Sequence, residues 1–248
     1  MRRHAFAPCP QCEIPKEMHC SGTWFHFQLV AKFNSCVCFL LDKCRPAYET
    51  MKLREARRSA RGQGQITFEF SPKKSAQAAA VLLGLNGGDM DKYLFIKMLY
   101  LADRKALEKW EEPITGDTVA MMQYGPVLST IYDLTKGKAF SCRDYWQNYI
   151  SDSDDETNIV ALVGDPGSSE LSDAEIAILE RVHAKFRTYD WRRMRDYCHD
   201  LPEFEEIGQT SKMLPTERIL EAIGFSESKI EGAKKRFQQI KIAEKLFA

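Results

Sequence analysis

The chain has 248 residues, of which 28% are charged and 44% are hydrophobic, and this composition is typical of a folded globular protein. Its formal net charge is zero, but residues 1–62 hold 11 Lys/Arg against 5 Asp/Glu, whereas residues 63–248 hold 24 against 30. Proteins that bind the phosphate backbone concentrate Lys and Arg on one face, so the acidic second part argues against that class. It suits a basic protein partner instead, because opposite surface potentials favour encounter.

The sequence contains no stretch that approaches the ~20 apolar residues needed to cross a bilayer. Arg2 and Arg3 are not followed by the apolar region and small-residue cleavage site of a secretory signal. We therefore expect a cytoplasmic protein with no membrane partner.

Six of the eight cysteines lie in the first 44 residues. Cys9 and Cys12 have the two-residue spacing with which two thiolates bind one zinc ion. The other two ligands would have to come from residues without a second Cys-x-x-Cys pair: His19, Cys20, His26, Cys36 and Cys38. Cys9 and Cys12 are therefore weak metal candidates, and we expect no cofactor.

The stretch before Met51 shows neither helical nor strand periodicity, and a Lys/Arg-rich run, 52–61, follows it. Two interpretations stay open for residues 1–62. Either they form a disordered, Cys-rich and basic extension, or residues 1–50 lie upstream of a true start at Met51. Residues 63–248 are expected to form the globular domain.

In chain order, residues 74–85 are expected to form a short helix, which the following Asn86-Gly87-Gly88 ends. Asp89 or Asp91 can cap the next helix, which should end near Trp110 because Pro113 forbids its continuation. This helix is apolar on every side over 93–102 and must therefore be buried on every side. We place it at the centre of the fold.

Residues 114–123 alternate as in a strand that ends at Gly125-Pro126, and Pro126 is expected at the first position of a helix that Gly137 ends. A second strand, 158–163, is predicted to pair with 118–124.

In the C-terminal half, Ser172 and Glu175 form a capping-box pattern, and Asp190 and Thr216 are further expected caps. The helices expected there are 172–188, 191–199, 216–223 and 226–246. The predicted fold class is mainly α (α+β), with a compact helical domain around a buried central helix and a small β-hairpin.

Three segments resemble catalytic, phosphate-binding or calcium-binding motifs, but each lacks a feature that the motif requires. Cys198, His199 and Asp200 are neighbours on a predicted helix and point about 100° apart, so they cannot converge as a triad. The glycine-rich 164–169 lacks the Gly-Lys-Ser/Thr ending of a phosphate loop. The acidic 152–156 lacks the spacing of a calcium loop. We therefore expect a protein that is not an enzyme.

Two segments are candidates for interaction. One is the corner at Tyr124-Gly125-Pro126-Val127 with Lys97, Tyr100 and Tyr132, because aromatic side chains beside a rigid turn suit a binding pocket. The alternative for this corner is a chain reversal that only packs the core. The other candidate is a helix-turn-helix pattern over 216–235, whose cations could meet phosphates although most helical hairpins bind no DNA. The cations of this pattern are Lys229, Lys234, Lys235 and Arg236.

A set of short motifs is spread over about residues 75–225: Lys97-Met98-Leu99-Tyr100-Leu101-Ala102-Asp103, Pro113-Ile114, Tyr124-Gly125-Pro126-Val127, Ile131-Tyr132, Leu171-Ser172 and His199-Asp200-Leu201-Pro202. In these motifs the sequence resembles a known family, the Panacea or SocA-like antitoxin domain of bacterial and phage toxin–antitoxin systems. The resemblance implies a compact, mainly α domain with a small β element. It also implies a cognate toxin encoded nearby, neutralised by direct contact or, as in one branch of the family, delivered to the ClpXP protease.

On this basis the partner-binding surface is expected at Lys97, Tyr100, Asp103, Tyr124, Gly125, Pro126 and Tyr132. The acidic loop 152–156 would join this surface if the toxin is basic. The alternative function is a phage-associated transcription regulator that binds DNA through the C-terminal helix pair.

Overall fold

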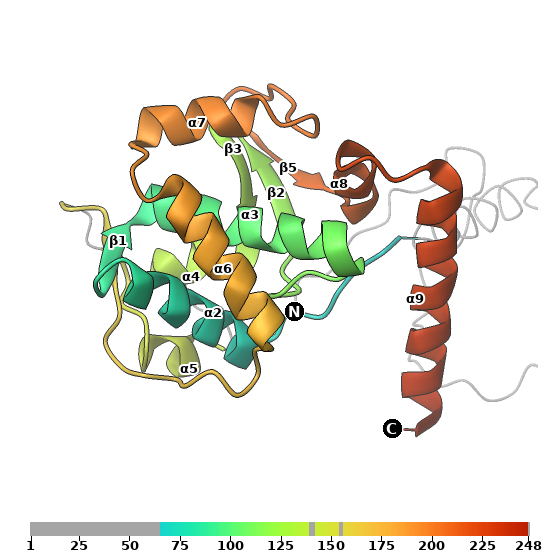
Figure 1. Cartoon of the computed structure of the whole chain (residues 1–248), viewed down its shortest axis with the longest axis horizontal. Helices are drawn as coiled ribbons and strands as arrows, with labels where there is room; N and C mark the ends of the chain where they lie inside the picture. Colours follow the sequence, from blue (N-terminus) through green and yellow to red (C-terminus); the bar gives the residue numbers. More distant parts are fainter. Residues whose placement is uncertain (1–64, 139–141, 154–155, 248) are drawn as a thin grey trace, which may run out of the picture. The chain divides into compact units, whose positions relative to one another are not determined.

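The computed structural model describes residues 65–138, 142–153 and 156–247 (Figure 1). The predictions for residues 1–62, including the zinc candidates Cys9 and Cys12, lie outside the described residues. The helices are α2 (Pro72–Leu85), α3 (Lys92–Trp110), α4 (Ser129–Thr135), α5 (Arg143–Gln147), α6 (Asp173–Phe186), α7 (Trp191–His199), α8 (Thr216–Ala222) and α9 (Glu227–Phe247). The strands are β1 (Asp89–Asp91), β2 (Val119–Met122), β3 (Gly125–Leu128), β4 (Ile159–Ala161) and β5 (Ser211–Leu214). The predicted fold class, mainly helical with a small antiparallel element, is confirmed.

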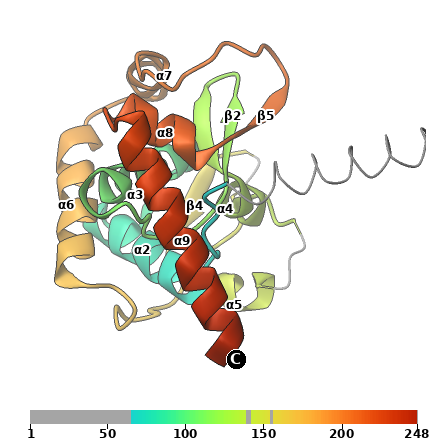
Figure 2. The same ribbon diagram turned by 90° about the vertical axis from the view of Figure 1, so that its right-hand side faces the viewer.

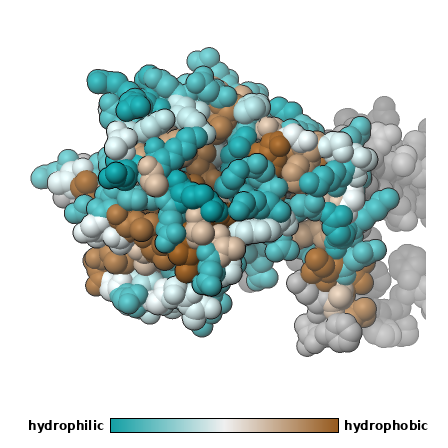
Figure 3. All heavy atoms as spheres, viewed as in Figure 1, coloured by the Kyte–Doolittle hydropathy of each residue, from teal (hydrophilic) through white to brown (hydrophobic). Residues whose placement is uncertain are grey.

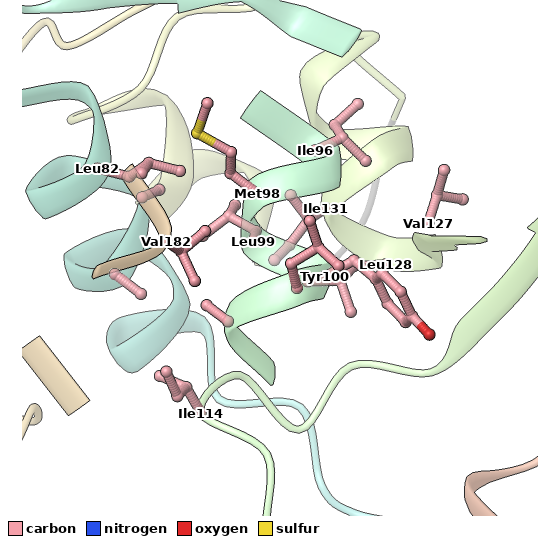
Figure 4. Packing of buried hydrophobic residues seen from close by; sticks show 14 of the residues in the cluster. Leu82, Ile96, Met98, Leu99, Tyr100, Ile114, Val127, Leu128, Ile131 and Val182 are labelled. Atoms are coloured by element: carbon pink, nitrogen blue, oxygen red, sulfur yellow. The ribbon is translucent and has the colours of Figure 1, made fainter. Parts of the chain in front are cut away.

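Helix α3 is the centre of the core, as predicted from its apolar circumference. Asp91 caps it by accepting a hydrogen bond from the backbone N–H of Leu94 (3.1 Å), and the helix ends at Trp110. Helices α2, α6 and α7 and strand β3 pack around it (Figures 1 and 4). Leu99 is 1% exposed, and burying a leucine side chain of this kind stabilises a fold by about 1.5–3 kcal/mol.

The expected helix caps are confirmed in all but one case. The Ser172–Glu175 capping box is present at α6, and Asp190 caps α7 through the N–H of Arg193. Thr216 does not cap α8: Pro215 is the N-cap residue, no side chain caps the helix, and Thr216 lies inside its first turn.

The predicted strand at 114–123 is present as β2 and forms a hairpin with β3. Strand β2 ends at Met122, before Gly125-Pro126. The expected helix start at Pro126 is wrong, because Gly125 and Pro126 pair within β3 and the next helix begins only at Ser129. In the strand order β3-β2-β5, β3 is an edge strand, where a proline without an N–H is tolerated.

The predicted pairing of 158–163 with 118–124 is also wrong. Strand β4 pairs antiparallel with β1, and β2 instead pairs with β5 on its second side. Asn158 helps to fix the observed pairing, since its side-chain amide donates to the carboxylate of Asp91 (3.0 Å) and its carbonyl accepts from the N–H of Lys92 (2.8 Å). A three-residue strand such as β1 is too short to show periodicity.

The last helix, α9, lies in the foreground of Figure 2, contacts α8 and has its buried side chains in its first half. Ile230 and Ala233 are buried, and the ring of Phe237 meets that of Phe68 edge-on, with the ring centroids 5.3 Å apart. Further along the helix, Ile240 is 49% exposed. Among the described helices, none combines the length and the apolar character that a membrane span requires.

Candidate partner-binding pocket

A pocket of about 460 Å³ lies where the first turns of α3 face the β2–β3 turn. This volume lies within the range of pockets that hold small molecules or short peptide segments. Its described lining contains two lysines and no carboxylate: Lys92, Tyr93, Ile96, Lys97, Met122, Gln123, Tyr124, Val127, Tyr132, Asn158, Gln209 and Thr210. A cationic, partly apolar pocket therefore opens in a domain that is acidic as a whole.

The rim of the pocket is aromatic. Tyr124, at the hairpin turn, is 47% exposed, and the Tyr93 hydroxyl donates to its carbonyl oxygen (2.9 Å). The two rings meet edge-on with centroids 6.5 Å apart. Tyr132 is half-buried, with the Lys136 amine 4.1 Å from its ring centroid. Tyr124 is thus an exposed aromatic side chain on a turn that a hydrogen bond holds in place.

Lys97 lies at the floor of the pocket and is 1% exposed. Its amine donates to the carbonyl oxygen of Pro126 (2.8 Å) and lies 5.3 Å from the ring centroid of Tyr93. Burial lowers the pKa of Lys97 to about 8, because the charged form loses its hydration. Lys97 therefore joins α3 to the start of β3 directly beneath the aromatic rim.

Gly125 is required by the close approach of β3 to α7. Its φ is +93°, a left-handed conformation that favours glycine. A Cβ at this position would lie 2.8 Å from the Cβ of Cys198 and 3.4 Å from the Lys97 amine. Burial raises the pKa of Cys198 to about 11, so its thiol stays protonated and unreactive near neutral pH.

Tyr100 and Asp103, both expected on the binding surface, are enclosed by the fold. The Tyr100 hydroxyl donates to the Glu203 carboxylate (2.6 Å), which also accepts from the Arg104 guanidinium (2.6 and 3.1 Å). Asp103 accepts from the backbone N–H groups of Ile114 and Thr115 (3.0 and 3.1 Å), and burial raises its pKa to about 7. The two residues hold the framework behind the pocket and do not reach its surface.

Sequence reasoning missed three parts of the site. Tyr93 was counted only as an apolar helix residue, although its hydroxyl fixes the turn. Gln209 and Thr210 come from a distant loop that carries no pattern in the sequence. Asp117 caps α4 across the hairpin by accepting from the N–H groups of Thr130 and Ile131, and its distance along the chain gives no local signal.

In the other two candidate segments, several charged side chains form ion pairs within the domain. Asp152 of the acidic loop forms an ion pair with Arg143 (3.0 Å), and residues 154–155 lie outside the described residues. Lys229 and Arg236 of the helix pair both contact Glu111, and Lys234 contacts Glu231 (2.6 Å).

The Cys198-His199-Asp200 segment does not converge as a catalytic group. His199 lies on Phe204, with ring centroids 4.1 Å apart, and its Nε2 contacts the carbonyl oxygen of Gln123 (3.1 Å). In the part of the chain that the structure describes, no cluster of three or more His, Cys, Asp or Glu could hold a metal ion.

Comparison with known proteins finds a family model that matches part of this chain. Residues 95–204, from the first turn of α3 to just beyond α7, match the family model described as the Panacea domain of SocA-like antitoxins. The match includes Lys97, Tyr100, Asp103 and the 124–127 corner, and it confirms the resemblance drawn from the sequence. Over residues 95–204 the chain is therefore similar to the SocA-like antitoxin family. No curated protein and no solved structure matches the chain.

Proposed function

We propose that this protein is an antitoxin that neutralises a cognate protein toxin by binding it directly at the pocket beneath Tyr124. The family match supports a toxin partner. The observation that supports the location is the exposed Tyr124 side chain at the mouth of a cationic pocket. The turn that carries it is held by hydrogen bonds from the Tyr93 hydroxyl to the Tyr124 carbonyl and from the Lys97 amine to the Pro126 carbonyl.

This arrangement suits a protein interface. Tyrosine buries a large area with few rotatable bonds, and binding hot spots are enriched in it. A turn that is already fixed loses little conformational entropy when the partner binds. Tyr93, Tyr124 and Tyr132 would supply the contact area, and Lys97, buried with one hydrogen bond to the protein, would hold the turn in place.

The toxin is expected in the adjacent reading frame, as the family resemblance implies. The test is growth of cells that express this neighbour with and without the full-length chain. Tyr124→Ala should abolish rescue, whereas Trp110→Ala, which removes another exposed aromatic side chain (40% exposed) away from the pocket, should leave it intact. Rescue that survives Tyr124→Ala would place the contact elsewhere. A harmless neighbour would refute the assignment of that reading frame as the toxin.

Two routes of neutralisation are separated by the fate of the toxin. In direct neutralisation the toxin accumulates and copurifies with this chain. In proteolytic delivery its half-life shortens when the chain is present and recovers in cells that lack ClpX. The pocket serves either route, because both begin with toxin binding.

The DNA-binding alternative finds less support. Lys229, Lys234 and Arg236 already contact carboxylates, and helix α8 has only seven residues. A regulator that used these cations would bind DNA with an affinity that falls steeply with salt. Absence of such binding by the purified chain would leave the antitoxin proposal standing.

A further inference from the structure

A basic surface lies on α6 and α7, outside the pocket described above. Residues 181–195 contain six Lys/Arg and one Asp, whereas residues 63–248 together carry a net charge of −6. Residues 181–195 therefore carry a formal net charge of +5, and the remaining residues of 63–248 carry −11. In Figure 3 the side chains over α7 are predominantly hydrophilic. Such a concentration of charge attracts an anionic partner.

A groove of about 310 Å³ between α3 and α6 forms one end of this surface. Leu101, Ile178 and Val182 provide apolar walls, and Tyr197 of α7 lies at its edge. Four cations line it, with Glu108 as the single carboxylate among the described lining residues: Arg104, Lys105, Arg181 and Lys185. The groove therefore offers apolar contact and positive charge together.

Two of these cations are available to a ligand. Arg104 is held by Glu203, and Lys105 pairs with Glu108 (2.7 Å). Within the described part of the chain, Arg181 and Lys185 form no ion pair, and both are exposed. Among the described residues, the Lys185 amine contacts neutral groups: the Tyr197 hydroxyl at 3.0 Å and the ring centroids of Tyr197 and Phe186 at 4.5 and 4.9 Å.

The surface continues along α7 through guanidinium groups on aromatic rings. Arg193 lies 4.4 Å from the ring centroid of Tyr189, and Arg192 and Arg195 lie 5.2 and 5.4 Å from that of Trp191. Trp191 is itself 45% exposed. Trp, Tyr and Arg are the residues that most often dominate binding at protein interfaces.

We propose that this surface docks an acidic peptide segment of a protein partner, in which Asp or Glu residues alternate with apolar ones. The carboxylates would pair with Arg181, Lys185, Arg192 and Arg193, and guanidinium groups provide two-pronged hydrogen bonds for this purpose. Arg195 already pairs with Asp196 (2.6 Å). An apolar side chain would enter the groove over Leu101. This site is additional to the toxin pocket and does not depend on it.

Nucleic acid fits the surface less well. Single-stranded nucleic acid binds to a row of free aromatic faces, whereas the rings of Phe186, Tyr189 and Tyr197 pack edge-on against one another. A long polyanion would also meet the acidic remainder of the domain. A short acidic peptide would not extend that far.

The test is selection from a random dodecapeptide display library on the full-length chain, followed by fluorescence anisotropy with the enriched peptides. We expect acidic peptides with interspersed apolar residues to be enriched. Their Kd should rise at least tenfold for Arg181→Glu with Lys185→Glu. The matched control, Lys73→Glu with Lys235→Glu, makes the same change in charge at exposed positions and should leave Kd within twofold.

Three results would overturn the proposal. Enriched peptides without excess acidic residues would do so, and so would equal weakening in the two charge-reversal variants. A dT12 oligonucleotide that binds more tightly than the best peptide, and loses binding in Arg181→Glu with Lys185→Glu, would assign the surface to nucleic acid. Toxin rescue is read in cells and is unaffected by any of these outcomes.

Discussion

The amine of Lys97 and the carbonyl oxygen of Pro126, 29 positions apart in the chain, are joined by a 2.8 Å hydrogen bond at the floor of the pocket. This bond connects the central helix α3 to the second residue of strand β3, close to Tyr124. Lys97 is 1% exposed, and its amine also lies 5.3 Å from the ring centroid of Tyr93. Burial of the amine in the folded state therefore gives Lys97 a pKa that differs from its value in the unfolded chain.

The buried amine predicts a specific pH dependence of stability. The pKa of Lys97 falls from 10.5 to about 8 on folding, so between these values the unfolded chain binds more protons than the folded one. The free energy of unfolding should therefore rise with pH from about 8, by an amount on the order of 1–3 kcal/mol when complete. Lys97→Met should remove this rise, as measured by urea unfolding between pH 7.5 and 9.

The window ends near pH 9 because other groups act with the opposite sign. Burial raises the pKa of Cys198 from 9.0 to about 11, so above pH 9 the unfolded chain loses protons that the folded chain keeps. Stability from this group falls with pH, and Cys198→Ala should separate the two effects. A rise over pH 7.5–9 that is equal in the wild type and in Lys97→Met would contradict the assignment to Lys97.

Asp103 predicts a second pH dependence, in the acidic range. Burial raises its pKa from 3.8 to about 7, so between these values the folded chain binds the extra proton. This group's contribution to the free energy of unfolding should fall as pH rises from 4 to 7. The measurement is the difference between the wild type and Asp103→Asn over that range. A difference that does not change with pH would show that Asp103 is already ionised at pH 4.

Gly125→Ala tests the close packing of β3 against α7. Alanine at this position would have an unfavourable positive φ, as at any left-handed position. Its Cβ would in addition lie 2.8 Å from the Cβ of Cys198. Gly167→Ala is the matched control, because Gly167 has φ +68° and no atom within 4 Å of an added Cβ. Overpacking costs about 1–3 kcal/mol, and Gly125→Ala should lose that much more than Gly167→Ala in denaturant unfolding. Equal losses would mean that the strand can shift away from α7.

Features that depend on local interactions could be predicted from the sequence, whereas features that depend on contacts between distant residues could not. Local signals sufficed for α3, whose apolar circumference predicted burial, and for the Ser172–Glu175 capping box. Strand pairing failed, because β1 and β5 are short and their partners are set by contacts distant in sequence. The site shows the same division: the burial of Tyr100 follows from the apolar helix that contains it, whereas the partner of its hydroxyl, Glu203, lies 103 positions further along and could not be predicted.

Glu203 provides the last prediction, because it accepts hydrogen bonds from both Tyr100 and Arg104 while only 2% exposed. Removing one partner of a buried ion pair leaves an uncompensated charge and destabilises by about 3–5 kcal/mol. Glu203→Ala should therefore lower the free energy of unfolding by roughly that amount. Glu205→Ala, which breaks an exposed pair with Lys212, should cost less than about 1 kcal/mol. Similar losses in the two variants would show that water reaches Arg104 once the carboxylate is gone, and Tyr100→Phe would then isolate the contribution of the hydroxyl.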